Sequence, residues 1–279
     1  MLQRIMPGHE DSGWRINAWH DNPAPVLNPL LFSLALAAAA PTPCPAETVC
    51  IMRDTDRYSF RFTYPMAAAR IAGLDGILRE RATDAEARLA AAAAADEGGQ
   101  RRRLRYESHY RLDAELPEII ALSGTIDIGE RRTRTALLFD PRDHKRLDLG
   151  DLFHAETFDN FLFRPRGMRA LQNSFCHALA DAVRNRRAEA QQRELDIDCP
   201  NVVHQPVTTI CNGQGRILGL RAFVTPVASR RVDPDAELTY AVDINLTAEM
   251  IGVMKQRYRV AFGLPGETRG RRRRSCPGT

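Results

Sequence analysis

One segment of the sequence fixes the architecture, and it reads Glu118-Ile-Ile-Ala-Leu-Ser-Gly-Thr-Ile-Asp-Ile-Gly-Glu-Arg-Arg-Thr-Arg-Thr-Ala-Leu-Leu-Phe139. Two apolar runs within it, 118–128 and 133–139, have the length and residue types of strands. The pair Gly129-Glu130 between them is typical of a hairpin turn. We therefore expect two neighbouring antiparallel strands here.

Further strands and two long helices are predicted on either side of this hairpin. Alternating apolar and polar residues predict strands over 58–64 and 103–114, and later strands over 218–223 and 238–244. Helical spacing predicts one helix over 66–95, a second over 168–193, and a short one that begins at Asn245 or Thr247 and ends near Met254. The last segment, 258–262, is expected to close the sheet. Hairpins with segregated helices predict an α+β fold, in which two long helices pack on a mainly antiparallel sheet in a single domain over 58–263.

Composition and charge exclude several classes of protein. Hydrophobic residues make up 44% and charged residues 27% of the 279 residues, which is ordinary for a globular protein and unlike a disordered or multi-span membrane protein. The formal charge is +4, and the tail over 264–279 alone carries five arginines against Glu267, a surplus of the same size. The rest of the chain is therefore close to neutral, which argues against nucleic acid as a partner. The basic tail is expected to be flexible, with at most a weak contact to an anionic surface.

The N-terminal region carries the pattern of a signal peptide. Residues 30–40 form an apolar run of eleven residues, about 16 Å as a helix and too short to cross a bilayer. Its length and its run of alanines before Pro41 indicate cleavage near Ala40. Because a long stretch precedes the apolar run, translation is expected to start at Val26 instead. We expect an N-terminal extension and signal peptide over 1–40, a mature N-terminal segment over 41–57, and a periplasmic or secreted location. The alternative is a buried alanine-rich helix.

Six cysteines favour disulfides in an exported protein. The two pairs closest in sequence are predicted to be structural disulfides, Cys44 with Cys50 and Cys199 with Cys211. Cys176 is expected to be buried in a helix and Cys276 to be free. Zinc at Cys199, His204 and Cys211 lacks a fourth ligand and the close Cys-x-x-Cys spacing of structural sites, so we predict neither a metal nor a cofactor.

Two groups of polar residues are candidates for function. Asp148 and Asp151 could act as a carboxylate pair on a glycan, but at the start of a short helix their spacing favours capping of free backbone N–H groups. Glu130, Arg131, Arg132 and Arg134 at the hairpin tip form the most charged patch, which could bind carboxylate groups of a partner. The alternative is a solvated edge whose charges prevent aggregation.

Several of these segments resemble the DUF4163/DUF3298 domains. The resemblance rests on Leu122-Ser-Gly-Thr-Ile-Asp-Ile, Leu137-Leu-Phe-Asp and Leu147-Asp-Leu-Gly-Asp-Leu-Phe, and later on Tyr240-Ala-Val-Asp-Ile and Tyr258-Arg-Val-Ala-Phe. It covers about residues 55–263. The segment Gly129-Glu-Arg-Arg-Thr-Arg departs from many members, which have a Gly-Gly-Ala-His-like sequence there.

The resemblance implies an exported or membrane-tethered α+β domain of a bacterial envelope. Such domains occur alone, fused to peptidoglycan deacetylases, or as the outer domain of anti-sigma factors that respond to lysozyme. We therefore expect a non-catalytic domain that binds a cell-wall component or a wall-degrading hydrolase such as lysozyme. The alternative is an enzyme acting on peptidoglycan glycan, as a hydrolase or a deacetylase.

Overall fold

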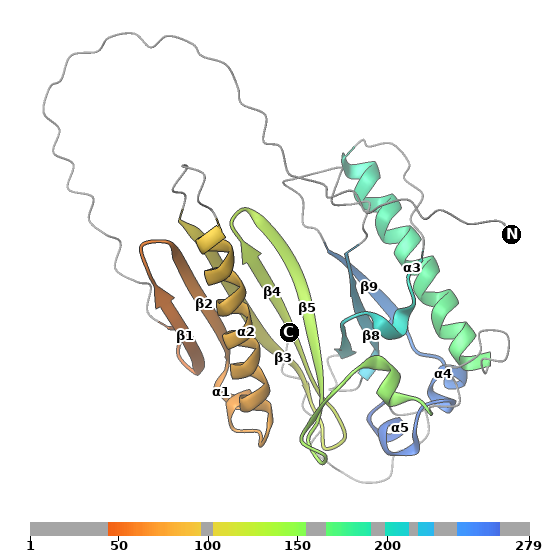
Figure 1. Ribbon diagram of the computed structural model, residues 1–279. Helices are drawn as coiled ribbons and strands as arrows, with labels where there is room; N and C mark the ends of the chain where they lie inside the picture. The colour runs from red at the N-terminus through yellow and green to blue at the C-terminus, as the bar shows by residue number, and fades with distance from the viewer. Residues whose placement is uncertain are drawn as a thin grey trace, which may run out of the picture. The chain divides into compact units, whose positions relative to one another are not determined.

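The computed structural model describes residues 44–95, 103–154, 166–190, 199–211, 217–225 and 239–262 (Figure 1). The chain divides into two units, and all of these residues belong to the second, Pro43–Thr279. The predicted signal peptide over 1–40, the tail over 264–279 and Cys276 lie outside the described residues. No helix in the described ranges is long and apolar enough to span a membrane.

Six strands form the first sheet, and they lie side by side in sequence order. They are β1 (Thr48–Asp54), β2 (Tyr58–Pro65), β3 (Leu104–Glu115), β4 (Ile120–Ile128), β5 (Arg131–Asp140) and β6 (Lys145–Leu147). All neighbours are antiparallel except β2 and β3. These two are parallel because helices α1 (Met66–Ala69) and α2 (Leu74–Ala95) carry the chain back between them. The predicted α+β fold with a mainly antiparallel sheet is confirmed.

The predicted hairpin is formed by β4 and β5. Ile128 pairs with Arg131 across the turn, and Ile120 pairs with Phe139 at the far end. Gly129 has a φ of 62°, a conformation that glycine adopts without the steric cost of a Cβ atom.

The last three strands form a separate sheet instead of extending the first. β7 (Val207–Cys211), β8 (Ile217–Val224) and β9 (Tyr240–Asn245) pair antiparallel in that order. Helix α3 (Arg166–Ala190) contacts β9, and two short helices, α4 (Ala248–Gly252) and α5 (Gln256–Phe262), follow β9. Two 3-10 helices, η1 (Leu149–Leu152) and η4 (Val202–His204), lie between these elements in the chain.

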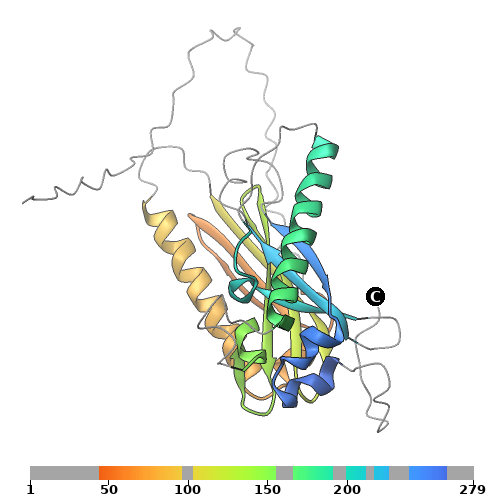
Figure 2. The same ribbon diagram turned by 90° about the vertical axis from the view of Figure 1, so that its right-hand side faces the viewer.

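The core consists of two apolar clusters. Helix α2 packs Leu74 and Leu78 against aromatic residues of β2 and β3, among them Phe60, Phe62 and Tyr110. The second and larger cluster joins α3, the three-stranded sheet, α4 and α5 to apolar residues of β4, β5 and β6. The two long helices thus cover different sheets, as Figures 1 and 2 show.

The helix predicted over 66–95 is divided into α1 and α2, so the prediction of one continuous helix is wrong. Helix α1 ends at Ala69, and Gly73, directly before α2, has a φ of 83°, which is outside helical geometry. A Cβ atom at this position would lie 3.0 Å from the Cβ atom of His144. Residue 73 is therefore placed where a positive φ and a close approach both favour glycine.

Two further elements differ from the prediction. The strand expected over 258–262 is helix α5, in which Tyr258, Ala261 and Phe262 are buried on one face at i, i+3 and i+4 spacing. Strand β7 lies in a segment for which the sequence analysis predicts no strand, although its sequence Val207-Thr-Thr-Ile is rich in β-branched residues.

Helix α5 is attached to the first sheet through the buried carboxylate of Asp140, which is 1% exposed. Tyr258 Oη donates to this carboxylate at 2.8 Å, and Arg257 Nη2 donates at 2.6 Å. The backbone N–H groups of Arg142 and Asp143 donate to its other oxygen at 2.9 and 3.2 Å. Four donors thus satisfy one buried charge.

These contacts decide the ionisation of Asp140. Burial alone would raise its pKa, but the hydrogen bonds from Tyr258 and the two backbone N–H groups, together with the charge of Arg257, outweigh burial and lower it. Burial and the hydrogen bond to Asp140 raise the pKa of Tyr258 to about 12, so its hydroxyl remains a donor at neutral pH.

The variant Asp140→Asn is expected to lower the free energy of unfolding at pH 7 by about 2–3 kcal/mol, because it removes a charged acceptor that has four donors. The folded pKa of Asp140 lies below the ordinary value of 3.8. The stabilisation is therefore complete above about pH 4 and is lost as the pH falls through the folded pKa. Urea unfolding followed by circular dichroism from pH 7 to pH 2 measures the difference between the two proteins.

The matched control is Asp181→Asn, which removes an exposed ion pair with Arg184 on α3. It should change stability by less than about 0.5 kcal/mol at any of these pH values. A difference between wild type and Asp140→Asn that stays constant down to pH 2 would contradict the role given to the ionised carboxylate.

Candidate functional site: a cleft beside strand β5

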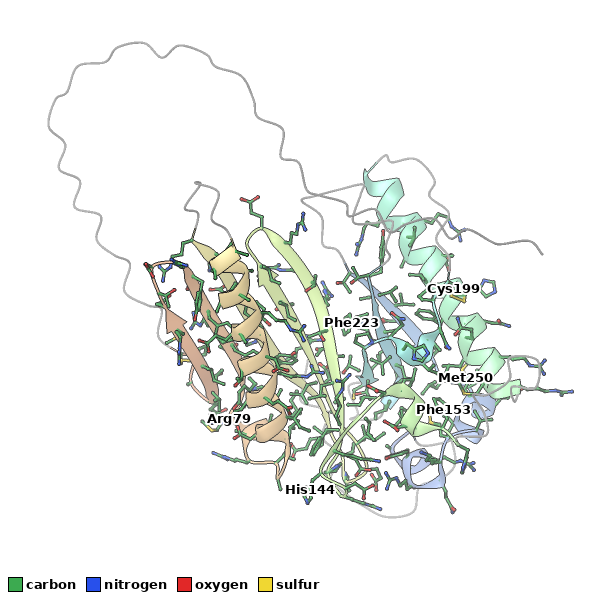
Figure 3. All side chains as sticks on the ribbon, in the orientation of Figure 1. Arg79, His144, Phe153, Cys199, Phe223 and Met250 are labelled. Carbon is green, nitrogen blue, oxygen red and sulfur yellow. A yellow bond between two sulfur atoms is a disulfide. The ribbon has the colours of Figure 1, made fainter. Side chains whose placement is uncertain are left out.

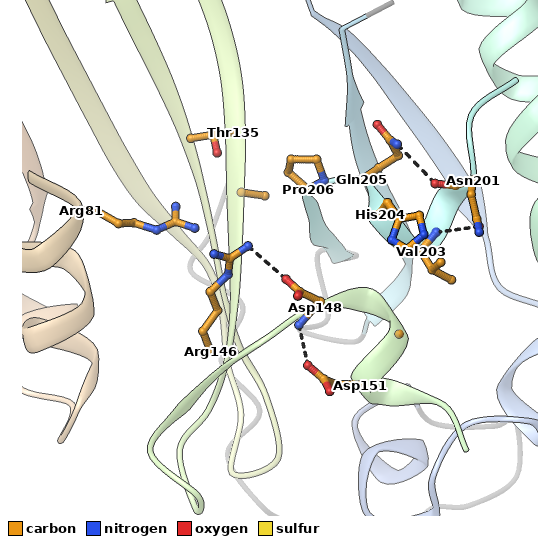
Figure 4. Close-up of a pocket in the computed structure, with 12 residues that line it drawn as sticks. Arg81, Thr135, Arg146, Asp148, Asp151, Asn201, Val203, His204, Gln205 and Pro206 are labelled. Carbon is orange, nitrogen blue, oxygen red and sulfur yellow. Dashed lines mark hydrogen bonds and ion pairs between the residues drawn. The ribbon is translucent and has the colours of Figure 1, made fainter. Parts of the chain in front are cut away.

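A cleft of about 700 Å³ opens beside strand β5 (Figure 4). Its volume is within the range of small-ligand sites, about 300–1,000 Å³. Residues from α2, β5, β6, η1 and η4 form its walls: Arg81, Thr135, Ala136, Arg146, Asp148, Gly150, Asp151, Asn201, Val203, His204, Gln205 and Pro206. It exists because β6 has three residues and pairs only with the last three residues of β5, Leu138 to Asp140.

Two arginines stand on the side of the cleft formed by the first sheet and its helix. Arg81 comes from α2 and donates a hydrogen bond to Tyr110 Oη at 3.2 Å. Arg146 comes from β6 and forms an ion pair with Asp148, with 3.0 Å between Nη2 and Oδ1. Figure 4 shows the Arg81 side chain extending toward Arg146, and the guanidinium of Arg146 joined to Asp148 at the start of η1.

Helix η1 contributes the two carboxylates that the sequence analysis considered for catalysis. Asp148 is its N-cap, and the backbone N–H of Asp148 donates to Asp151 Oδ2 at 2.9 Å. The predicted capping role is confirmed for Asp151. Both side chains also line the cleft, so capping and a contact with a ligand are compatible.

Contacts with the C-terminal part of the chain hold η1 in place. Leu149 and Leu152 are buried, and the backbone N–H of Lys255 donates to the Leu152 carbonyl at 2.8 Å. Phe153 forms a β-bridge with Met254 and belongs to the same apolar cluster as Met250. Figure 3 labels Phe153 and Met250 in this region.

The opposite wall of the cleft is η4 and the residues next to it. Asn201 Oδ1 accepts from the backbone N–H of Val203 at 3.3 Å, and Gln205 Nε2 donates to the Asn201 carbonyl at 3.3 Å. Each of these amides has made one internal hydrogen bond. Asn201 Nδ2 and Gln205 Oε1 have no partner among the described residues, so a donor and an acceptor are left at the cleft.

Helix α3 fixes this wall through Gln172 and a disulfide. Gln172 Nε2 donates to the Pro200 carbonyl at 2.9 Å, and its Oε1 accepts from the Val202 backbone N–H at 3.0 Å. Cys176, one turn further along α3, forms a disulfide with Cys199. Figure 3 shows Cys199 against α3. Sequence reasoning missed this wall, although Gln172 and Cys176 share the i, i+4 spacing of one helix face.

The cysteine pairing corrects one prediction and confirms another. Cys44 is bonded to Cys50, as predicted. The predicted pairing of Cys199 with Cys211 is wrong, because Cys199 is bonded to Cys176. Cys211 is also part of a disulfide, with a cysteine other than Cys199. The unfavoured zinc arrangement also fails on this point, since a disulfide sulfur is not a thiolate ligand.

The residues predicted at the hairpin tip lie apart from the cleft lining. Arg132 forms a two-pronged ion pair with Asp127 on the neighbouring strand, at 2.7 and 3.2 Å. Arg134 is half-buried, and its backbone N–H donates to Thr239 Oγ1 at 3.1 Å. Glu130 and Arg131 are exposed. Binding by this patch stays a prediction, and Arg132 has a partner within the hairpin itself.

Replacing both Cys176 and Cys199 by alanine is expected to lower the free energy of unfolding by about 3 kcal/mol, the loop-entropy value for a loop of this length. It should also speed hydrogen exchange at the Val202, Val203 and Gln205 amides, because their segment loses its covalent attachment to α3. Exchange measured by mass spectrometry under native conditions reports this.

The control is the double variant Cys44→Ala/Cys50→Ala, which removes the disulfide at the start of the described chain. Its amides over 201–205 should exchange at the wild-type rate. Equal exchange in all three proteins would show that the disulfide does not hold the cleft wall.

Comparison with known proteins gives structural similarity at low sequence identity. No family model matches the chain, and no curated protein matches it either. A DUF3298 family protein from Pseudomonas aeruginosa PAO1 is similar at 12% identity, with a TM-score of 0.40, over 77% of this chain and 96% of that one. A member of that family from Bacteroides fragilis NCTC 9343 is similar at 12% identity, with a TM-score of 0.36, over the same shares. Both are described as members of the family that the sequence motifs resemble.

Proposed function

We propose that this chain is a non-catalytic, exported domain of a bacterial envelope, and that it binds a cell-wall component in the cleft beside β5. The proposal rests on the cleft itself, which has a volume of about 700 Å³ and in which two arginines face two amide side chains. Concave sites of this size with a few convergent polar groups are the usual sites of small ligands. The envelope assignment is supported by the sequence resemblance, and the disulfides fit an oxidising compartment.

The two carboxylates of η1 support binding more than catalysis. A glycan hydrolase needs one carboxyl group as acid and a second as base or nucleophile, placed on either side of the bond that breaks. Here Asp151 is engaged with the backbone N–H of Asp148, and Asp148 is paired with Arg146. Both groups therefore already have structural partners.

The shape of the site favours a wall component over a hydrolase. A protein partner typically covers about 800 Å² of each surface, and its contacts spread over 20–30 residues. The cleft is concave and is lined by twelve residues. A fragment of the wall fits such a site better than a folded enzyme does.

The purified domain, without residues 1–40, is expected to co-sediment with peptidoglycan sacculi. The variant Arg81→Gln should bind about 10–100-fold more weakly, the usual effect of losing a charge-assisted hydrogen bond. Arg184→Gln is the matched control, because Arg184 is an exposed arginine on α3 paired with Asp181 and does not line the cleft. It should sediment like the wild type.

The same incubation tests the alternatives. Soluble muropeptides or released acetate in the supernatant would identify an enzyme acting on the glycan and overturn the non-catalytic assignment. Retention of lysozyme by the immobilised domain, without binding to sacculi, would replace the wall component by a hydrolase as the ligand.

A further inference from the structure

The charges of the cleft are separated into a positive and a negative end. Arg81 stands at the α2 side, and its hydrogen-bond partner is the neutral hydroxyl of Tyr110; it has no carboxylate partner among the described residues. At the η1 side, two carboxylates face the single guanidinium of Arg146. One positive charge at the first end and one negative charge at the second are thus left without an opposite charge in the lining.

The wall opposite the two arginines carries two amide side chains. Asn201 Nδ2 is a donor and Gln205 Oε1 an acceptor, each left by an internal hydrogen bond that uses the other end of the same side chain. A peptide group offers the complementary pair, a carbonyl and an N–H. Among the described lining residues there is no Phe, Tyr or Trp, and the imidazole of His204 is the one aromatic ring, so sugar rings have little stacking surface there.

We propose that the cleft recognises a short peptide that carries both a free carboxylate and a free amine. Its carboxylate binds the guanidinium of Arg81, its ammonium lies against Asp148 and Asp151, and one of its peptide groups bonds to Asn201 and Gln205 on the opposite wall. This inference rests on the proposed function and makes the stem peptide of the wall, rather than its glycan, the moiety that is bound.

The charge pattern also discriminates against other ligands. A dianionic phosphate would be attracted by Arg81 but repelled by the two carboxylates of η1, which line the same cleft. A purely cationic ligand would be attracted by the two carboxylates but repelled by Arg81 and Arg146. A zwitterion places each of its charges next to the group of opposite sign.

The probes are stem peptides released from sacculi by an amidase, the same peptides after acetylation of their amines or amidation of their carboxylates, and the glycan strands left behind. Calorimetric titration of the wild-type domain is expected to show binding of the unmodified peptides. Each modification should weaken binding at least tenfold, and the glycan strands should not bind.

Two variants test which end of the cleft binds the carboxylate of the peptide and which binds its amine. Arg81→Gln should bind the unmodified and the amidated peptides equally, because the group that senses the carboxylate is gone. Asp151→Asn keeps a side-chain oxygen for the Asp148 N–H and should lose most of the preference for the free amine. Arg184→Gln should retain both preferences.

The outcomes separate this inference from the proposed function. Binding of sacculi and glycan strands without binding of free peptides, or equal affinity for modified and unmodified peptides, would overturn the peptide assignment and leave wall binding intact. Binding of the free peptides without binding of sacculi would support the cleft chemistry and overturn the wall as its source.

Discussion

A buried carboxylate ties the first sheet to the C-terminal helix α5. Asp140 ends strand β5 and is almost completely inaccessible to water, so its charge is tolerated only if donors surround it. The turn that follows Asp140 supplies two donors. The other two come from Arg257 and Tyr258, and Tyr258 lies 118 positions further along the chain. The first sheet therefore has its lowest free energy only when the C-terminal helices have docked.

The cleft follows from the same contacts. The turn after Asp140 leads directly into β6 and η1, and the end of η1 is bonded to the segment just before α5 through Lys255 and Met254. The chain between Asp140 and Phe153 is thus fixed at both ends to the C-terminal helices. This places Arg146, Asp148 and Asp151 at defined positions, on short elements that have little stability of their own.

The sequence was informative where local chemistry decides the structure and uninformative where distant partners do. The β4–β5 hairpin, the break at Gly129 and the capping by Asp151 follow from strand patterning and from turn and cap residues. The helix at 256–262 was mistaken for a strand because five residues show too little periodicity, and its buried face became evident only with Asp140 in contact. The partner of Cys199 and the cleft depend on which elements meet in space, which one sequence does not reveal.

The disulfide between Cys176 of α3 and Cys199, next to η4, has a consequence for the stage at which this wall of the cleft becomes rigid. Thiols remain reduced in the cytosol, and oxidation follows only after transfer to an oxidising compartment. Formation of the Cys176–Cys199 disulfide therefore fixes the wall with Asn201 and Gln205 to α3 only when these thiols are oxidised. Under the proposed export to the envelope, this wall of the cleft would become rigid only in the compartment that holds the proposed wall ligand.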